Sequence, residues 1–360
     1  MVHRVECLDV GQGTCNLIQL PGNRFIVIDV GPRGGGWQVL IDRLRLDPDL
    51  PQESLPVIEV LILSHSHEDH IGALSSLLES GARIERILFT DDRPIRDDHP
   101  ALRVIQDAAR RGKLSMDCVW STIETDADGP RTVFQSADPD DEPNGRVALT
   151  LLHPDGIYAK KARERGQPNL AFAILHMRVG DHRFLFPGDA PLDAFEVVSD
   201  NFGRSVELEL MAVPHHGGKT WNGKLSPGRR TRLQKLFQER FRVKSAVISI
   251  GSANSNKHPF ESVIKALLEA GSHVLCTELT CRCWVNDLDE ARELTLAHDP
   301  PHYHGLSRKT RPVGKATNVG CASTVVVKFE NRVPVIERRS ELRGVVENLK
   351  RSGSPMCTVN

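Results

Sequence analysis

The feature that most constrains this chain is a short apolar run that ends in a cluster of histidines. Residues 60–63 are Val-Leu-Ile-Leu and predict a buried strand. Apolar residues then recur at helical spacing from Ile71 to Leu78. Between these two elements lies the polar segment His65-x-His67-x-Asp69-His70. The strand is therefore expected to deliver three imidazoles and a carboxylate into one turn at its C-terminal end.

These residue types point to metal binding. Neutral imidazole and carboxylate oxygen are ligands that suit zinc, manganese or iron(II). His65 and His67 are two positions apart and can converge on one ion, while Asp69 and His70 are placed for a second ion. The alternative is a solvated polar loop, and so many imidazoles directly after a strand argue against it.

Composition describes an ordinary soluble globular protein. The 360 residues suffice for one large domain or two small ones, and 39% are apolar while 26% are charged. The sequence contains no run of about eighteen apolar residues, so no membrane span is predicted. The first residues, Met1 to Glu6, lack the apolar core of a signal peptide, so a cytoplasmic location is expected.

The histidine segment resembles the HxHxDH signature of the metallo-β-lactamase superfamily. Further segments occur in the order and spacing of the ComEC-type nuclease domain, the soluble part of a competence DNA-uptake protein. They are Leu8-Asp9-Val10-Gly11-Gln12-Gly13, Val27-Ile28-Asp29-Val30-Gly31, Pro187-Gly188-Asp189-Ala190, Pro214-His215-His216-Gly217-Gly218-Lys219-Thr220, Ser249-Ile250-Gly251, Asn254 and His258-Pro259. The resemblance covers about residues 3 to 276 and the expected strand at 323–329. It implies a soluble nuclease domain that stands alone, without the membrane-embedded part of the competence protein.

The expected fold is an α/β protein of the metallo-β-lactamase type, an αββα sandwich of two sheets flanked by helices. Residues 1–276 and 321–334 form the predicted metallo-β-lactamase domain. Residues 277–320 are an insertion bearing Cys and His, and residues 335–360 are a charged tail. Residues 124–145, rich in acids with Pro and Gly, are expected to form a surface loop.

The resemblance implies two divalent metal ions, Zn²⁺ or Mn²⁺, with a bridging hydroxide. We expect His65 and His67 to bind the first ion, Asp69 and His70 the second, and Asp189 to bridge them. His215 is expected to complete the second ion, with His216 the less favoured member of that pair.

The third ligand of the first ion stays open among His153, Asn169 and His176. By resemblance, Asn169 occupies the position that the ComEC-type pattern gives to an Asn. Where that family usually has Ser three residues later, this chain has Phe172.

Other roles also come from the resemblance. Asp29 is expected to orient the histidine segment, unless it only caps a turn. Asn254 and His258 resemble substrate-side residues, and His258 is the expected general acid. Lys219 is expected to neutralise charge on the substrate. The predicted catalytic residues are therefore Lys219 and His258, together with the metal ligand Asp69.

Charge is balanced overall but not locally. The net charge is −1, so no global field attracts nucleic acid. Residues 219–244 nevertheless contain nine basic side chains and one acid, Glu239. Because this stretch follows His216, it is interpreted as a track for a polyanion, with a solvated helix face as the alternative.

Four of the eight cysteines bracket a segment that bears His298, His302 and His304: Cys276, Cys281, Cys283 and Cys321. In a cytosolic chain such a cluster suggests a metal more than disulfides. A structural zinc and ordinary thiols are the two alternatives, because the spacing matches no standard zinc knuckle.

The predicted function is a metal-dependent phosphodiester hydrolase that acts on DNA as a nuclease. One alternative is a hydrolase of a cyclic nucleotide or another small phosphodiester, favoured by the even charge. Another is a non-catalytic interaction protein whose insertion binds a protein partner. A β-lactam substrate is disfavoured, because Lys219 and the basic stretch suit a polyanion better.

Overall fold

The computed structural model describes eleven segments of the chain. They are residues 2–33, 36–45, 56–92, 99–125, 129–136, 146–166, 170–203, 205–220, 227–251, 258–278 and 324–337. All structural statements below concern these residues.

The first sheet contains nine strands along the described chain, and it is built mostly from the N-terminal half. Its order is β16-β15-β1-β2-β3-β4-β6-β7, with β5 also paired to β4. The strands are β1 (Arg4–Cys7), β2 (Asn16–Leu20), β3 (Arg24–Ile28), β4 (Val57–Leu63), β5 (Arg83–Ile84), β6 (Arg86–Thr90), β7 (Val119–Ile123), β15 (Val325–Glu330) and β16 (Val333–Ile336). Because β15 pairs antiparallel with β1, the two ends of the described chain meet in this sheet.

The second sheet, as described, has seven strands in the order β14-β13-β12-β11-β10-β9-β8. They are β8 (Arg131–Gln135), β9 (Val147–His153), β10 (Ile174–Val179), β11 (His182–Phe186), β12 (Val206–Ala212), β13 (Phe241–Ile248) and β14 (His273–Cys276). Strands β10 and β11 form an antiparallel hairpin whose turn contains Gly180 and Asp181.

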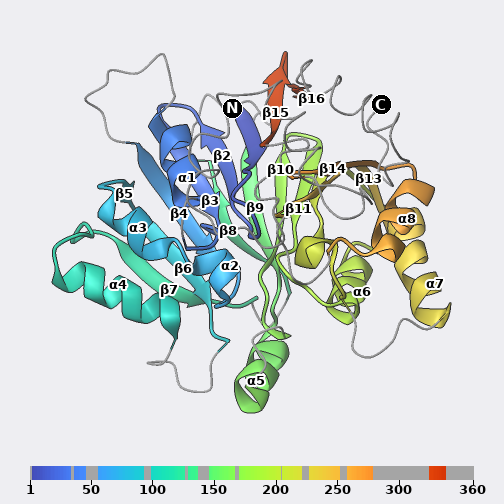
Figure 1. The fold of residues 1–360 in the computed structure, drawn as a ribbon, viewed down its shortest axis with the longest axis horizontal. Helices are drawn as coiled ribbons and strands as arrows, with labels where there is room; N and C mark the ends of the chain where they lie inside the picture. The colour runs from blue at the N-terminus through green and yellow to red at the C-terminus, as the bar shows by residue number, and fades with distance from the viewer. Residues whose placement is uncertain are drawn as a thin grey trace, which may run out of the picture.

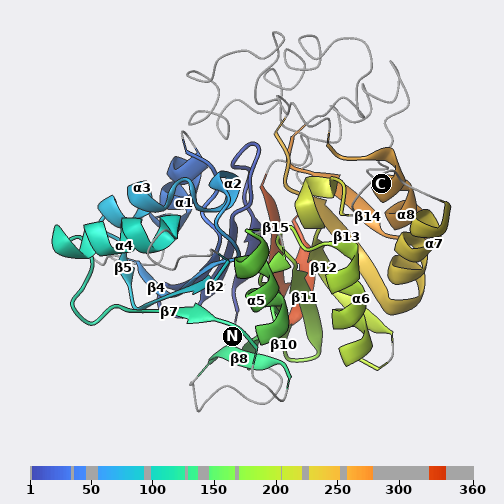
Figure 2. The same ribbon diagram turned by 90° about the horizontal axis from the view of Figure 1, so that it is seen from below.

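Helices cover the outer faces of both sheets, as the expected αββα sandwich requires (Figures 1 and 2). Over the first sheet lie α1 (Gly36–Arg45), α3 (Leu74–Glu79) and α4 (Pro100–Arg110), and over the second lie α6 (Leu192–Asn201), α7 (Pro227–Lys235) and α8 (Glu261–Glu269). The short helical turns are α2 (Glu68–Ile71), η3 (Pro214–Gly217) and η4 (Leu236–Arg240). Helix α5 (Gly156–Arg165) extends away from the sandwich at the bottom of Figure 1.

Both faces of the central strands are buried, which explains their unbroken apolar runs. In β2, Leu17 packs in the layer between the first sheet and its helices, whereas Ile18 packs between the two sheets. Leu61 and Ile62 of β4 divide in the same way. Successive side chains of a strand point to opposite faces, so a strand buried on both faces cannot alternate with polar residues.

The arrangement of parallel strands fixes where polar loops meet. In the first sheet β3, β4 and β6 run parallel to one another, as do β11, β12 and β13 in the second. The carboxyl ends of parallel neighbours lie at one edge of a sheet, where loops can carry ligands. The loops after β3, β4, β11 and β12 carry Asp29, the histidine segment, Asp189 and His215-His216.

Three details differ from the sequence-based expectations. The range 124–145 is not wholly a loop, since β8 lies within it and pairs with β9. Helices α5 and α6 were not predicted. Half of the residues in α5 are charged, so its apolar pattern is too weak to indicate a helix. Strand β16 extends to Ile336, inside the range assigned to the tail.

None of the helices that can be described is both long and apolar enough to cross a membrane.

Burial on β4 gives a test of the sandwich. Ile62 is fully buried between the sheets, and Ile62→Ala should lower the free energy of unfolding by about 2–5 kcal/mol through lost contacts and a cavity. Val119 on the edge strand β7 is 59% exposed, so Val119→Ala should change it by less than about 0.5 kcal/mol. Denaturant unfolding of both variants measures the difference. Equal effects would contradict this layer assignment.

Candidate metal centre

The histidine segment leaves β4 at the edge between the two sheets. His65 and His70 are buried, while His67 and Asp69 are partly exposed. Asp69 and His70 lie in α2, whose first turn begins after His67. The rings of His65 and His70 have centroids 4.0 Å apart, and those of His65 and His67 are 4.6 Å apart. The three imidazoles therefore form one cluster.

The carboxylate of Asp29 holds this segment from the neighbouring strand β3. It accepts hydrogen bonds from the backbone N–H of Ser64 and the Ser64 hydroxyl, each at 2.7 Å. Its Oδ2 also lies 2.7 Å from His70 Nδ1. Asp29 is fully buried and has a φ of 59°, so the backbone adopts a left-handed conformation to aim this carboxylate.

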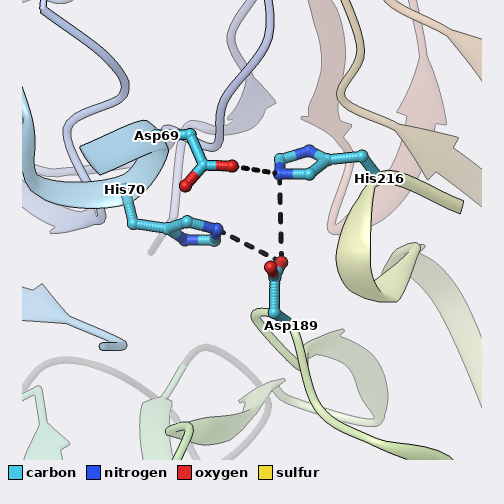
Figure 3. A group of neighbouring side chains, drawn as sticks. All are labelled: Asp69, His70, Asp189 and His216. Carbon is cyan, nitrogen blue, oxygen red and sulfur yellow. Dashed lines mark hydrogen bonds and ion pairs between the residues drawn. The ribbon is translucent and has the colours of Figure 1, made fainter. Parts of the chain in front are cut away.

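Asp189 lies between two groups of candidate ligands. One group is Asp69, His70, Asp189 and His216, and the other is His65, His67 and Asp189. Within each group the ligand atoms lie within 4.8 Å of one another. Figure 3 shows the first group, with the imidazoles of His70 and His216 directed at the Asp189 carboxylate. The distances from Asp189 Oδ1 are 3.2 Å to His70 Nε2 and 3.9 Å to His216 Nε2.

Hydrogen bonds on the far side of two rings decide which nitrogen faces the centre. His216 Nδ1 donates to the carbonyl oxygen of Ser249 at 2.7 Å, and His70 Nδ1 faces Asp29. The Nε2 atom of each ring is thereby directed at the centre, as in metal-binding histidines. His65 Nε2, His70 Nε2 and Asp189 Oδ1 are buried and lack a well-aligned hydrogen bond, although the last two form an ion pair at 3.2 Å. Buried polar atoms without partners are costly, and a divalent cation among them would satisfy all three.

Two carboxyl groups and two imidazoles stabilise one another's charged forms. Burial alone would raise the pKa of Asp189, but His70, His216 and His215 hold it well below its usual range. Burial alone would lower the pKa of His70, but Asp189 and Asp29 hold it well above its usual range. Asp69 and Asp189 likewise outweigh burial at His216 and raise its pKa.

The imidazoles of the other group behave differently. Burial and the neighbouring His70 lower the pKa of His65 well below its usual range, against the charge of Asp189. Burial also lowers the pKa of His67, opposed by Asp189, Asp69 and Asp92. His65 is therefore neutral at pH 7, which is the form that coordinates metals.

The sequence profile described as Metallo-beta-lactamase superfamily matches residues 8–155, the range that includes the histidine segment. The match and the two-sheet sandwich agree. The chain has the metallo-β-lactamase fold.

Two curated relatives are similar over most of the chain. Recombination protein 2 of Haemophilus influenzae is 26% identical over 296 residues, which are 82% of this chain and 30% of that protein. ComE operon protein 3 of Bacillus subtilis is 24% identical over 290 residues, which are 76% of this chain and 32% of that protein. The chain thus spans about a third of the length of these relatives.

Solved structures of the metallo-β-lactamase fold show a more distant likeness. The metallo-β-lactamase fold protein YhfI from Bacillus subtilis has a TM-score of 0.42 and 15% identity, covering 77% of this chain and 96% of that chain. Zn²⁺-bound PqqB from Methylobacterium extorquens has a TM-score of 0.42 and 14% identity, covering 73% of this chain and 84% of that chain.

At the loop after β12 the structure favours the residue that the sequence analysis ranked second. His216 is buried and belongs to the group with Asp69, whose Oδ2 lies 3.1 Å from its Nε2. His215 is more exposed, and its Nδ1 lies 3.3 Å from Asp189 Oδ2. Both residues have left-handed backbone conformations, with φ of 53°. This reversal of direction in η3 turns the second imidazole inward, which alternation along the sequence does not reveal.

The open question of the third ligand receives a partial answer. His153 ends β9, and its Nε2 lies 3.1 Å from the carbonyl oxygen of Leu170. His176 on β10 packs against the ring of Phe202. Neither residue belongs to the two described groups, in which Asp189 is the third member beside His65 and His67. Asn169 lies outside the described residues.

Phe172 packs against the group of His65, His67 and Asp189. Its ring lies edge-on to His65, with centroids 4.1 Å apart, and it is fully buried. In this fold it holds the imidazole by contact on one side, where a Ser would instead offer a hydroxyl.

The residues expected on the substrate side are described in part. Lys219 is exposed after η3. His258 is buried, with its ring centroid 5.4 Å from that of His215. Burial, with His215 and His216, lowers the pKa of His258 to about 4, so the ring is neutral at pH 7. Its role as general acid stays a prediction. Asn254 lies outside the described residues.

Three cations of the basic stretch pair with acidic side chains of the same chain. Arg232 of α7 pairs with Glu196 and Asp193 of α6, which raise the pKa of its guanidinium. Arg240 pairs with Asp200, and Lys244 with Glu209. Helix α7 lies at the right edge of Figure 1, away from α2. Arg232 and Arg240 fit the solvated helix face, the alternative interpretation, whereas Lys244 lies on strand β13.

The cysteine cluster is described at one member. Cys276 is buried at the end of β14. Cys281, Cys283 and Cys321 lie outside the described residues, so the structural zinc stays a prediction.

The two histidines of η3 form a matched pair for a metal-content measurement. His216→Ala should lose one of the bound divalent ions, because its Nε2 is directed at the centre. His215→Ala should retain both, because this ring lies at the exposed rim. Elemental analysis after reconstitution with Mn²⁺ or Zn²⁺ and dialysis gives the metal content. Loss in the His215 variant with retention in the His216 variant would reverse the assignment.

His153 gives a pH-dependence that is independent of metal. Burial lowers its pKa to about 4, against the Leu170 carbonyl and Asp155. Between about pH 6.5 and pH 4 the unfolded chain binds this proton and the folded chain does not, so folding loses about 3 kcal/mol as the pH falls through that window. His153→Gln should remove that part of the pH-dependence. Urea unfolding of metal-free wild type and variant at pH 7, 5.5 and 4 measures it. A stability difference that is constant with pH would contradict a neutral, buried His153.

Proposed function

We propose that this protein is a metal-dependent phosphodiester hydrolase that acts on DNA, with two divalent cations, Zn²⁺ or Mn²⁺, bound between the sheets. The observation that carries the proposal is the pair of ligand groups sharing Asp189. Each group offers imidazole nitrogen and carboxylate oxygen, and the atoms without hydrogen-bond partners face one another. Such mixed nitrogen and oxygen sets suit these metals.

The DNA substrate is supported by similarity and by the rim of the site. One curated relative is named Recombination protein 2, and recombination is a reaction of DNA. Lys219 is exposed three residues after His216, where a compact cation can pair with phosphate oxygens. The chain covers about a third of that relative, so its activity is carried over here as a proposal.

Different residues of the chain have different roles in the proposed reaction. His65, His67, Asp69, His70, Asp189 and His216 would hold the metals. When bound, a pair of divalent cations supplies a nucleophile at neutral pH and polarises a phosphoryl oxygen. Asp29 orients His70, Lys219 neutralises negative charge on the substrate, and His215 lies at the exposed rim beside the buried His258. Asp189 contributes the carboxylate that both ligand groups require.

A second candidate substrate is a small phosphodiester such as a cyclic nucleotide. The pairing of Arg232, Arg240 and Lys244 with the chain's own acids favours it, because these cations are not available to a long phosphate backbone. Direct comparison of substrates separates the two candidates.

Asp189→Asn tests the proposed function most simply. It should lower hydrolysis by about 10²-fold or more, because several kcal/mol of charge stabilisation depend on the metals. Asp193→Asn is the matched control, since Asp193 is exposed on α6 and pairs only with Arg232 among its described contacts. Purified proteins are assayed with Mn²⁺, Mg²⁺ or Zn²⁺ on single- and double-stranded DNA, RNA and a chromogenic phosphodiester.

Each outcome of this assay has a meaning. DNA cleavage by wild type and the control, lost in Asp189→Asn, supports the nuclease. Cleavage of the chromogenic diester without cleavage of nucleic acid supports the small substrate. Equal activity in Asp189→Asn and wild type, with contaminating enzymes excluded, would refute the proposed centre.

A further inference from the structure

A second buried carboxylate reaches the histidine segment from the opposite side to Asp29. Asp92 follows β6, and β6 is the neighbour of β4 on the side away from β3. Its Oδ2 accepts a hydrogen bond from the backbone N–H of Ser66 at 2.7 Å. Ser66 is the residue between His65 and His67. The Asp92 side chain is fully buried, so this contact is made away from water.

His99 forms the other side of this contact. Its Nε2 lies 3.3 Å from Asp92 Oδ1, and the ring is buried against Phe89. His99 Nδ1 accepts a hydrogen bond from the N–H of Ala101 at 3.2 Å, because His99 caps the N-terminus of α4. With Nδ1 as an acceptor, the proton of the neutral ring is on Nε2, facing Asp92. Helix α4 and Asp92 are thus joined beneath the segment.

The two carboxylates divide the segment between them. Asp29 binds Ser64 and His70, whereas Asp92 binds the backbone of Ser66. Thr90 adds a hydrogen bond from its hydroxyl to the carbonyl oxygen of Ser64 at 3.1 Å. The backbone on both sides of His65 is therefore fixed by β3 and β6 together.

We propose that Asp92 is a positioning residue for the ligand group of His65, His67 and Asp189, with His99 holding Asp92 in place. This inference rests on the proposed metal centre and deepens it. A hydrogen bond from N–H to a carboxylate is about twice as strong as one between neutral groups, and burial strengthens it further. Groups that orient metal ligands typically contribute about 10- to 100-fold in metal affinity.

The test measures metal affinity rather than turnover. Wild type, Asp92→Ala and Asp92→Asn are titrated with Zn²⁺ or Mn²⁺ against a competing chelator, and both binding steps are resolved. Asp91→Asn is the control, because Asp91 is the adjacent carboxylate and pairs with Arg163 at 2.9 Å instead. The melting temperature of each metal-free protein is measured alongside.

We expect Asp92→Ala to weaken one of the two ions by about 10- to 100-fold and to leave the other nearly unchanged. Asp92→Asn keeps an oxygen that can accept the Ser66 N–H, so it should recover part of that loss. Asp91→Asn should bind both ions as wild type does. If the alanine variant does not fold, the asparagine variant decides, with an expected loss of up to about tenfold at one ion.

Two results would overturn the inference. Unchanged affinities in the Asp92 variants would show that the carboxylate does not position the ligands. Equal weakening of both ions, with a lowered melting temperature of the metal-free protein, would show a general structural role. A wild-type protein that binds no divalent ion at all would instead refute the metal centre itself, which separates that failure from this one.

Discussion

The carboxylate of Asp189 is the group on which the rest of this site depends. It comes from the loop after β11 in the second sheet, whereas four of the five other candidate ligands come from the loop after β4 in the first sheet, and His216 comes from η3 after β12. Its two oxygens lie 3.2 Å from His70 Nε2 and 3.3 Å from His215 Nδ1. Burying a carboxylate is unfavourable unless cations or hydrogen-bond donors surround it, and here they come from both halves of the sandwich. The site therefore exists only when the two sheets are packed together.

The backbone at this edge is held in unusual conformations. Asp29, Gly188, His215 and His216 have φ of 59°, 52°, 53° and 53°. A residue other than Gly in this region costs of order 1–3 kcal/mol, and such residues gather at functional sites. At Gly188 a side chain would also press on Ser64, since a Cβ would lie 3.1 Å from its Oγ. The close approach of these loops therefore depends on glycine at position 188 and on the left-handed backbone of Asp29, His215 and His216.

Much of this site could be predicted from the sequence, because its ligands are concentrated in one motif. The run from Leu61 to His70 predicts a buried strand with metal ligands at its end, and the family resemblance carried by the other segments implies the sandwich. Asp189 was predicted as the shared carboxylate, and the structure places it between both groups. Asp29 was predicted to orient the segment, and its hydrogen bonds to Ser64 and His70 accord with that role.

What the sequence could not supply depends on three-dimensional contacts. His215 and His216 are equivalent as letters, and only the left-handed turn of η3 distinguishes them. Asp92 was missed because it lies 26 positions from Ser66, the residue that it binds. Its place two residues after a parallel strand was nevertheless a usable signal. The basic residues of 219–244 suggested a polyanion track because the sequence does not show their partners. Asp193, Glu196 and Asp200, which pair with Arg232 and Arg240, lie on another helix.

The central claim is that divalent cations occupy the space between the two ligand groups. The most direct measurement is anomalous X-ray scattering from crystals of the protein grown with Mn²⁺ or Zn²⁺. The account predicts two anomalous peaks on either side of the Asp189 carboxylate, each roughly 2.0–2.2 Å from the imidazole nitrogens and carboxylate oxygens of its group. Crystals grown with either metal that show no anomalous peak among these side chains would contradict it.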